Sequence, residues 1–398
     1  MSKKPLFSFD FVAICLVIFL TYCNITVFYN LYSYLEAIGI ARDWRGFLIG
    51  ASSLSTMVLF LFASPYLTIR NAGRCAALGV VLLVGCGLAY IPVRSLTGIL
   101  ALRLINGAAI YLLSAACMTM FVSRIPPERS GQAFSLYSVA LLLPYSIVPT
   151  VMAVVTPHLT SAAYGYRDMA LLLVPGLAML GIMSRRKSTA GVATKAPAPI
   201  SLGDMYRNVF TAPIALVLGL NALYIVTFSS LFFLAKGLFQ SLGYADVGYY
   251  FSIQMCCMIA VRVLGNRLFD RVRKITLIRW SFALSAVSFV LAARATDLVG
   301  LYGSSLAMGI GMGMGSPALY ALMFHISPPE YKALDSNLMM LSLQIGNFLG
   351  PFLGTWIMHR MGYDGFLLAD AAISLLAVAL CSILTCRRVD PEKLAATA

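Results

Sequence analysis

Charged residues are scarce in this sequence of 398 residues, because Asp, Glu, Lys and Arg make up only 11% of it and hydrophobic residues 60%. A soluble domain has about 25% charged and about 45–50% apolar residues. A soluble core of this length could not bury so much apolar surface. The composition therefore excludes a soluble globular protein and favours one that lies in a lipid bilayer.

The sequence also lacks the motifs of enzymes, ATP-driven pumps and metal sites. It has no HExxH, GxSxG or GxxxxGK[ST] motif and no paired aspartates inside its apolar runs. None of its nine cysteines has CxxC spacing, and its three histidines lie near the ends of apolar runs. We therefore expect a membrane protein that is not an enzyme and that needs neither a metal nor a cofactor.

Twelve apolar runs are long enough to cross the bilayer, which takes about 20 residues of helix. They are 10–35, 45–68, 74–92, 97–122, 132–156, 167–183, 209–235, 246–267, 275–293, 299–324, 334–357 and 364–386. They predict an all-α polytopic membrane protein with twelve transmembrane helices. We expect residues 1–184 to form one six-helix bundle, 207–398 a second, and the polar stretch 185–206 a cytoplasmic linker between them.

The Lys and Arg residues indicate the topology. Of the 29, about 20 lie in one set of breaks between the apolar runs and only seven in the alternating set. This is the positive-inside pattern, and it places both termini in the cytoplasm. The net charge of +14 is therefore a topology signal and does not indicate nucleic-acid binding.

The second half of the chain repeats the first after about 202 positions. Residues 96–128 lie without gaps on residues 298–330. The matched positions include Gly107 with Gly309, Pro126 with Pro328, Pro127 with Pro329, Glu128 with Glu330 and, further on, Pro149 with Pro351. Such a parallel duplication predicts two pseudo-symmetric bundles that rock about a central site.

Several motifs resemble those of the major facilitator superfamily. The stretch GNRLFDRVRK at 265–274 is similar to its G-x-x-x-D-R-x-G-R-R loop signature, with one extra residue after the first Gly and without the later Gly. In the equivalent loop of the first half, Arg70 stands where the acid would be. Arg103 and Gly107 match the family's R-x-x-x-G pattern, and GNFLGPFLG at 346–354 resembles the antiporter signature G-x-x-x-G-P-x-x-G.

This resemblance implies the superfamily fold and a secondary transporter that works by alternating access. Small bacterial drug and sugar efflux permeases are the most similar members, so we expect a monomer in the bacterial inner membrane that exports a small polar or amphipathic solute, with protons as the coupling ion. The antiporter signature lies in the run 334–357 instead of 132–156, where the superfamily carries it. An uptake symporter or a facilitator of a small organic solute, anions included, therefore stays open, as does a sensor with a transporter fold.

Polar side chains near mid-depth are the candidate solute ligands. They are Asn24, Tyr29, Arg103, Asn106, Tyr145, Asn221, Tyr224, Gln254, Gln344 and Asn347. Amides and tyrosines with one arginine suit a modest-sized polar or amphipathic solute. Each of them has an alternative role as an interhelical hydrogen bond.

Ionisable groups inside apolar runs are costly and indicate a partner or a polar cavity. For Arg103 the alternatives are a solute contact and a structural ion pair, with Glu36 as the expected partner. The coupling and gating candidates are Glu36, Arg262, Asp270, Arg271 and Asp370. Asp270 is expected to act as a latch that pairs with a base or caps a helix N-terminus. Arg262 is expected to snorkel or to brace the Asp270 loop.

Two further expectations concern proton coupling and helix packing. Asp370 is a candidate proton carrier, although its helix lies outside the cavity in the resembled fold. Gly309, Gly311, Gly313 and Gly315 form two i, i+4 pairs that predict close helix packing, and Pro317 predicts a kink.

Overall fold

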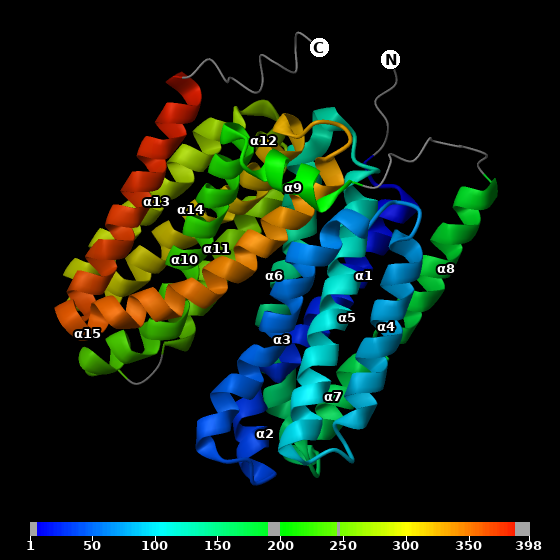
Figure 1. Ribbon diagram of the computed structural model, residues 1–398. Helices are drawn as coiled ribbons and strands as arrows, with labels where there is room; N and C mark the ends of the chain where they lie inside the picture. The colour runs from blue at the N-terminus through cyan, green and yellow to red at the C-terminus, as the bar shows by residue number, and fades with distance from the viewer. Residues whose placement is uncertain (1–5, 190–199, 245–246, 387–398) are drawn as a thin grey trace. The chain divides into compact units, whose positions relative to one another are not determined.

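The structure is a computed structural model in which residues 6–189, 200–244 and 247–386 are described (Figure 1). Over these residues the chain is almost entirely helical and contains no β-strand, which confirms the all-α prediction. Of the predicted linker 185–206, positions 190–199 lie outside the described residues. The chain divides into two compact units, and the division does not fall at a single point of the sequence.

The first unit contains residues 1–125 and 140–205. Its helices are α1 (Phe9–Thr26), α2 (Leu31–Ala37), α3 (Arg42–Ala63), α4 (Ala72–Ala89), α5 (Leu96–Val122), the later part of α6 (Ser130–Val155), α7 (Ala162–Leu171) and α8 (Val174–Thr189). The first apolar run, predicted as one helix, is interrupted by the 3₁₀ turn η1 (Val27–Asn30) between α1 and α2. Asn30 in this turn accepts a hydrogen bond of 2.9 Å from the hydroxyl of Tyr166 on α7. The apolar pattern of residues 10–35 by itself does not predict this contact with a residue far along the sequence.

The second unit contains residues 126–139 and 206–398. Its helices are the start of α6, the end of α9 (Leu202–Val209), α10 (Ala212–Ser241), α11 (Gly248–Leu264), α12 (Leu268–Arg271), α13 (Lys274–Arg294), α14 (Leu298–Ile326) and α15 (Lys332–Cys386). Gly362 has a positive φ of 73°, which glycine adopts without a steric penalty. The ribbon of α15 turns back there, from its orange half to its red half (Figure 1).

The described helices account for the twelve predicted spans. Ten helices are long and apolar enough to cross a membrane. The last of these, Lys332–Ser382, is long enough to cross twice because it turns back at Gly362, and the shorter apolar helix α11 corresponds to a further predicted span. With 17 residues, α11 is about 25 Å long, close to the thickness of the hydrocarbon layer.

The sequence repeat recurs in the helix contacts of the two units. A Cβ atom on Gly107 of α5 would collide with the backbone oxygen of Ser52 on α3. A Cβ atom on Gly309 of α14 would lie 2.7 Å from the backbone oxygen of Gln254 on α11. Both partners are shifted by 202 positions. The α3–α5 and α11–α14 pairs are therefore the same close contact, made twice.

Side-chain hydrogen bonds show the same register. The thiol of Cys86 lies 3.8 Å from the backbone oxygen of Leu102, and the hydroxyl of Ser288 donates to that of Ser304 over 2.7 Å. Again each position in the second unit is 202 beyond its counterpart. The duplicated helices thus pack in the same way within each unit.

The glycines of α14 pack on two different neighbours, as the i, i+4 spacing predicts. Gly309 and Gly313 face α11, whereas Gly311 and Gly315 face α13, and Gly315 also meets the ring of Tyr224 on α10. In lipid the hydrophobic effect does not bring helices together, and small residues favour their association because they let the backbones approach and pack closely. The glycine stripe therefore sets the position of α14 in the second unit.

Candidate functional site

Arg103 is held by α3. Its side chain is 5% exposed; its Nε donates to the backbone oxygen of Leu48 over 3.0 Å, and its Nη2 to that of Ile49 over 2.7 Å and to the hydroxyl of Ser52. The guanidinium also lies over the ring of Phe28, 5.1 Å from its centre. Because Gly107, one turn further along, lets the two helices approach, the R-x-x-x-G pattern works here as a joint between α5 and α3.

The expected ion pair between Arg103 and Glu36 is wrong. The carboxylate of Glu36 pairs with Arg45 over 2.8 Å, and Arg45 also donates from Nε to the backbone oxygen of Ile40. Carbonyl oxygens of the adjacent α3 take the donors of Arg103. The side chain of Glu36 is 63% exposed, so this pair contributes little to stability.

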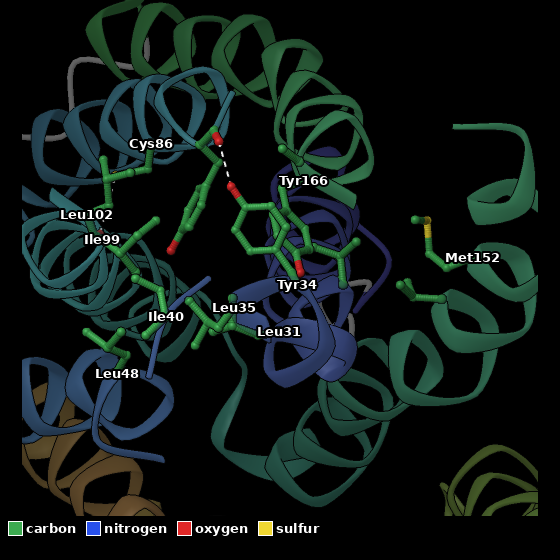
Figure 2. Close-up of a cluster of buried hydrophobic side chains, with 14 of the residues drawn as sticks. Leu31, Tyr34, Leu35, Ile40, Leu48, Cys86, Ile99, Leu102, Met152 and Tyr166 are labelled. Carbon is green, nitrogen blue, oxygen red and sulfur yellow. Dashed lines mark hydrogen bonds between the residues drawn. The ribbon is translucent and has the colours of Figure 1, made fainter. Parts of the chain in front are cut away.

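Four aromatic rings surround the break in the first span. Phe28 lies 4.5 Å from the ring centre of Tyr166 and 5.3 Å from that of Tyr90, and Tyr34 lies 5.4 Å from Tyr166. Figure 2 shows the hydroxyl of Tyr34 donating to the backbone oxygen of Tyr90 over 2.9 Å. Sequence reasoning did not select these tyrosines, since nothing in their spacing distinguishes them from the other tyrosines of the chain.

The remaining candidates of the first unit divide into buried and exposed side chains. Asn24 and Asn106 are buried, and within the described residues the Oδ1 atom of each has no hydrogen-bond partner. Tyr29 is exposed. Tyr145 is exposed as well, and its ring centre lies 6.3 Å from that of Tyr22.

In the second unit, two candidates make interhelical hydrogen bonds. Asn221 on α10 donates from Nδ2 to the hydroxyl of Ser342 over 2.6 Å and to the backbone oxygen of Met339 over 3.0 Å, which joins α10 to α15. Tyr224 donates to the backbone oxygen of Met312 on α14 over 2.5 Å. Both residues thus make interhelical hydrogen bonds of the kind expected as their alternative role, and their role as solute ligands stays a prediction.

The other candidates on α11 and α15 differ in burial. Gln254 is buried, and its Oε1 atom has no hydrogen-bond partner among the described residues. Gln344 is half-buried and Asn347 is exposed. Gln254 thus joins Asn24 and Asn106 as a buried amide with a free acceptor.

Arg262 reaches three backbone oxygens and is only 3% exposed. Its Nε donates to Gly313 over 3.3 Å, its Nη2 to Met312 over 3.4 Å and its Nη1 to Ser138 on α6 over 3.3 Å. Met312 also accepts from Tyr224, so two predicted residues converge on one carbonyl. Arg262 is therefore buried among helices and does not snorkel.

Asp270 caps the N-terminus of α6, one of the two roles expected for it. Its Oδ1 accepts from the backbone N–H of Gly131 over 2.8 Å and of Gln132 over 3.2 Å, two donors that have no partner inside the helix. Burial raises the pKa of Asp270, and the two N–H groups together with the charges of Lys274 and Arg129 oppose that rise. Arg271, next in the loop, is exposed.

The start of α6 in turn supplies a donor to the end of α11. Ser135 on α6 donates from Oγ to the backbone oxygen of Arg262 over 2.6 Å, at a helix end where carbonyls lack intrahelical donors. Sequence reasoning missed Ser135 and Ser138. A signal existed, because Gly131, Ser135 and Ser138 are spaced by four and three and so share one face of α6.

Asp370 lies buried in the second half of α15. Its Oδ2 is 2.6 Å from the hydroxyl of Ser230 on α10. The three ion pairs found among the described residues do not include it. It is thus an acid in apolar surroundings that is held by a hydroxyl group.

A family model described as Major Facilitator Superfamily matches residues 14–272 and 217–398. No curated protein sequence matches the chain.

Solved structures of low sequence identity share the fold. A bacterial homologue of the iron transporter ferroportin, in an outward-facing state, has a TM-score of 0.78 at 16% identity, over 95% of this chain and 100% of that one. The human organic anion transporter TETRAN has a TM-score of 0.72 at 16% identity, over 95% and 100%. A proton:xylose symporter bound to a halogenated glucose has 0.69 at 14% identity, over 93% and 94%.

Proposed function

Because the chain belongs to the Major Facilitator Superfamily, whose members are transporters and not enzymes, we propose that it exports a small polar solute by alternating access in exchange for protons. It is a multi-pass membrane protein with twelve transmembrane helices in two six-helix bundles. The family sets the class of function. The solute, the direction and the coupling ion are our proposal, argued from the side chains of each unit.

The observation that carries the solute class is a set of buried amides, Asn24, Asn106 and Gln254, whose oxygen atoms find no hydrogen-bond donor in the described part of the chain. A buried polar atom without a partner costs about 1–3 kcal/mol, so a chain retains such atoms where a ligand or water completes them. Carbonyl acceptors suit a solute that donates hydrogen bonds from hydroxyl, amide or amine groups. The remaining candidates, Tyr29, Tyr145, Gln344 and Asn347, are accessible enough to contact it.

The two buried arginines argue against an anion as the first choice. Arg103 and Arg262 already donate to backbone oxygens on neighbouring helices. An anion would have to compete with these contacts. We therefore rank a neutral or cationic hydrogen-bond donor above the organic anion.

Asp370 is the residue that we propose to carry the coupling proton. The hydroxyl of Ser230 lies 2.6 Å from Asp370 and 3.1 Å from the backbone oxygen of Thr227, yet a hydroxyl group has one hydrogen. Both contacts are hydrogen bonds at the same time if Asp370 is protonated and donates to Ser230, which then donates to Thr227.

The experiment starts with the solute, which we would identify by comparing the metabolites retained by cells with and without the protein. Accumulation in the deleted strain supports export, whereas depletion indicates uptake and overturns the proposed direction. Membrane vesicles then measure transport of that solute with an imposed pH gradient. We expect Asp370→Asn to abolish the response to the gradient, while Asp43→Asn, at an exposed acid, keeps it. An unchanged response in Asp370→Asn would exclude this carrier.

We also propose the cellular setting that the charge pattern predicts. The protein is a monomer in the bacterial inner membrane, with both termini in the cytoplasm and residues 1–184 and 207–398 as the duplicated bundles. Reporter fusions at the breaks after 92 and after 122 test the topology, because only the second of these is expected on the cytoplasmic side. Activity of a cytoplasmic reporter at the first would contradict it.

A further inference from the structure

Pro317 leaves a carbonyl group of α14 without its helical partner. Proline has no backbone N–H, so the oxygen of Gly313, four residues earlier, loses the α-helical hydrogen bond that residue 317 would donate. Both residues are buried, in a helix that crosses the membrane, where an unpaired backbone group is costly. Arg262 donates to this oxygen from Nε over 3.3 Å and to that of Met312, beside it, over 3.4 Å.

The same guanidinium reaches the start of α6. Its Nη1 donates to the backbone oxygen of Ser138 over 3.3 Å, and the backbone oxygen of Arg262 itself accepts from Ser135. Residues 126–139 belong to the second unit, whereas the rest of α6 belongs to the first. Arg262 thus joins the proline site of α14 to residues 126–139, which lie in the first half of the sequence.

The repeat shows that the fold does not require this arrangement. The position of Arg262 in the first unit holds Phe60, that of Gly313 holds Tyr111, and that of Pro317 holds Ala115. Phe60 and Tyr111 meet edge to face, with ring centres 4.9 Å apart. Where the helix has no proline the cross-helix contact is apolar, and where it has one the contact is an arginine.

We infer that Arg262 is a positioning residue that substitutes for the hydrogen bond lost at Pro317 and thereby sets how firmly residues 126–139 are held in the second unit. This inference rests on the proposed alternating access, in which the start of α6 must leave that unit. On release the contacts to Ser138 and Ser135 break, whereas those to Gly313 and Met312 stay within α11 and α14. Arg262 itself does not touch the solute.

A double-mutant cycle on the purified full-length protein tests the substitution. Arg262→Gln lowers the apparent melting temperature because the oxygen of Gly313 loses its donor. Pro317→Ala supplies a backbone N–H to that oxygen, so in this background we expect Arg262→Gln to cost about half as much or less. Equal losses in both backgrounds would overturn the link between the two residues. Arg103→Gln, a buried arginine in the first unit, is the control, and its loss is expected to be the same in both backgrounds.

Hydrogen exchange tests the hold on α6. We expect the amides of 130–138 to exchange about tenfold faster in Arg262→Gln, with or without Pro317→Ala, while those of α13 keep their wild-type rates. A uniform rise across the second unit indicates general destabilisation and contradicts a positioning role, as does no change at 130–138. If Arg262→Gln does not fold, Ser135→Ala removes one of the two hydrogen bonds between α6 and Arg262, leaves the guanidinium in place, and should give a local effect in the same direction.

Both measurements use protein without solute, so they separate this inference from the proposed function. A cycle with strong coupling in a protein that transports nothing would keep the inference and reject the transporter mechanism. Solute transport together with an additive cycle would do the reverse.

Discussion

The two units hold the matching helix pairs, α3–α5 and α11–α14, with an arginine at different heights along the helices. In the first unit, Arg103 on α5 donates to the backbone oxygen of Leu48 on α3. At the matching positions of the second unit, Ser305 donates to the backbone oxygen of Tyr250 over 2.5 Å. The second unit instead carries its arginine, Arg262, on the other helix of the pair, about two turns further along.

This difference separates what the fold needs from what each unit has added. Both units keep a hydrogen bond at the first level, whether the donor is a guanidinium or a hydroxyl, and both keep the close contact at Gly107 and Gly309. Each unit has an arginine between these two helices at only one height, Arg103 in the first unit and Arg262 in the second. The small residues therefore define the helix pair, and each arginine serves a local purpose, at the break beside Phe28 in one unit and at the carbonyl that Pro317 leaves without its donor in the other.

The loops that follow α3 and α11 differ in the same sense. Asp270 reaches out to cap α6. In the first unit the loop is closed on itself, since Asn71 accepts from the backbone N–H of Thr68 over 2.7 Å and donates to the backbone oxygen of Tyr66 over 2.8 Å. With Arg70 in place of an acid, this loop has no carboxylate to offer a helix N-terminus.

The largest expected effect comes from breaking the shared contact. Gly107→Val places side-chain atoms against the backbone of Ser52, which cannot move without shifting α3, and we expect a loss of about 3 kcal/mol or more. Yield and melting temperature of the detergent-solubilised protein measure it. Gly50→Val on α3 is the control, because nothing lies within 4 Å of a Cβ atom at that position. Equal losses in the two variants would show that close approach is not what Gly107 provides.

An intermediate effect is expected at the first level of bracing. Arg103→Leu removes charge-assisted hydrogen bonds to α3, each worth about 1.5–3 kcal/mol, whereas Ser305→Ala removes one neutral bond worth about 1 kcal/mol. Thermal unfolding of the two variants gives the order. Glu36→Gln serves as the control and should have almost no effect, since the exposed carboxylate pairs with Arg45. A loss at Glu36 as large as that at Arg103 would revive the ion pair that the structure excludes.

The smallest expected effect is a pH dependence of the α6 cap. Burial raises the pKa of Asp270 in the capped state above its value in a solvated, released loop, so the capped state binds the proton more tightly. Stability of the cap is therefore highest below the ordinary pKa of about 4 and falls as the pH rises to the raised value, beyond which it stays constant. Protection of the amides at 130–138 should decrease over that window, and Asp270→Asn should flatten the profile. Protection that rises with pH would reverse our assignment.

The sequence was sufficient for what depends on periodicity and composition. The spans, the repeat at 202 positions and the packing faces of Gly309, Gly311, Gly313 and Gly315 follow from spacing alone, and the contacts agree with them. These features depend on which residues share a helix face, and a sequence encodes that directly.

Contacts that depend on the direction of one side chain could not be predicted from the sequence. Depth along a helix matched Arg103 with Glu36, but depth does not say toward which neighbour the guanidinium turns, nor that carbonyl oxygens of α3 compete for it. The cap on α6 was one of two roles expected for Asp270, and its partners came only from the structure. The roles of the solute and coupling candidates stay predictions.

The boundary between the units lies within α6, after Val139, and the helix carries Pro144 and Pro149 just beyond it. Each proline deletes a rung of the backbone ladder, at the oxygens of Ala140 and Tyr145, so the helix is mechanically weakest beside the place where its two ends belong to different bodies. The helix can bend at these prolines without breaking its side-chain contacts to neighbouring helices. A single continuous helix can therefore act as a hinge at its prolines. Replacing Pro144 by alanine restores the backbone hydrogen bond to Ala140 and makes this hinge stiffer.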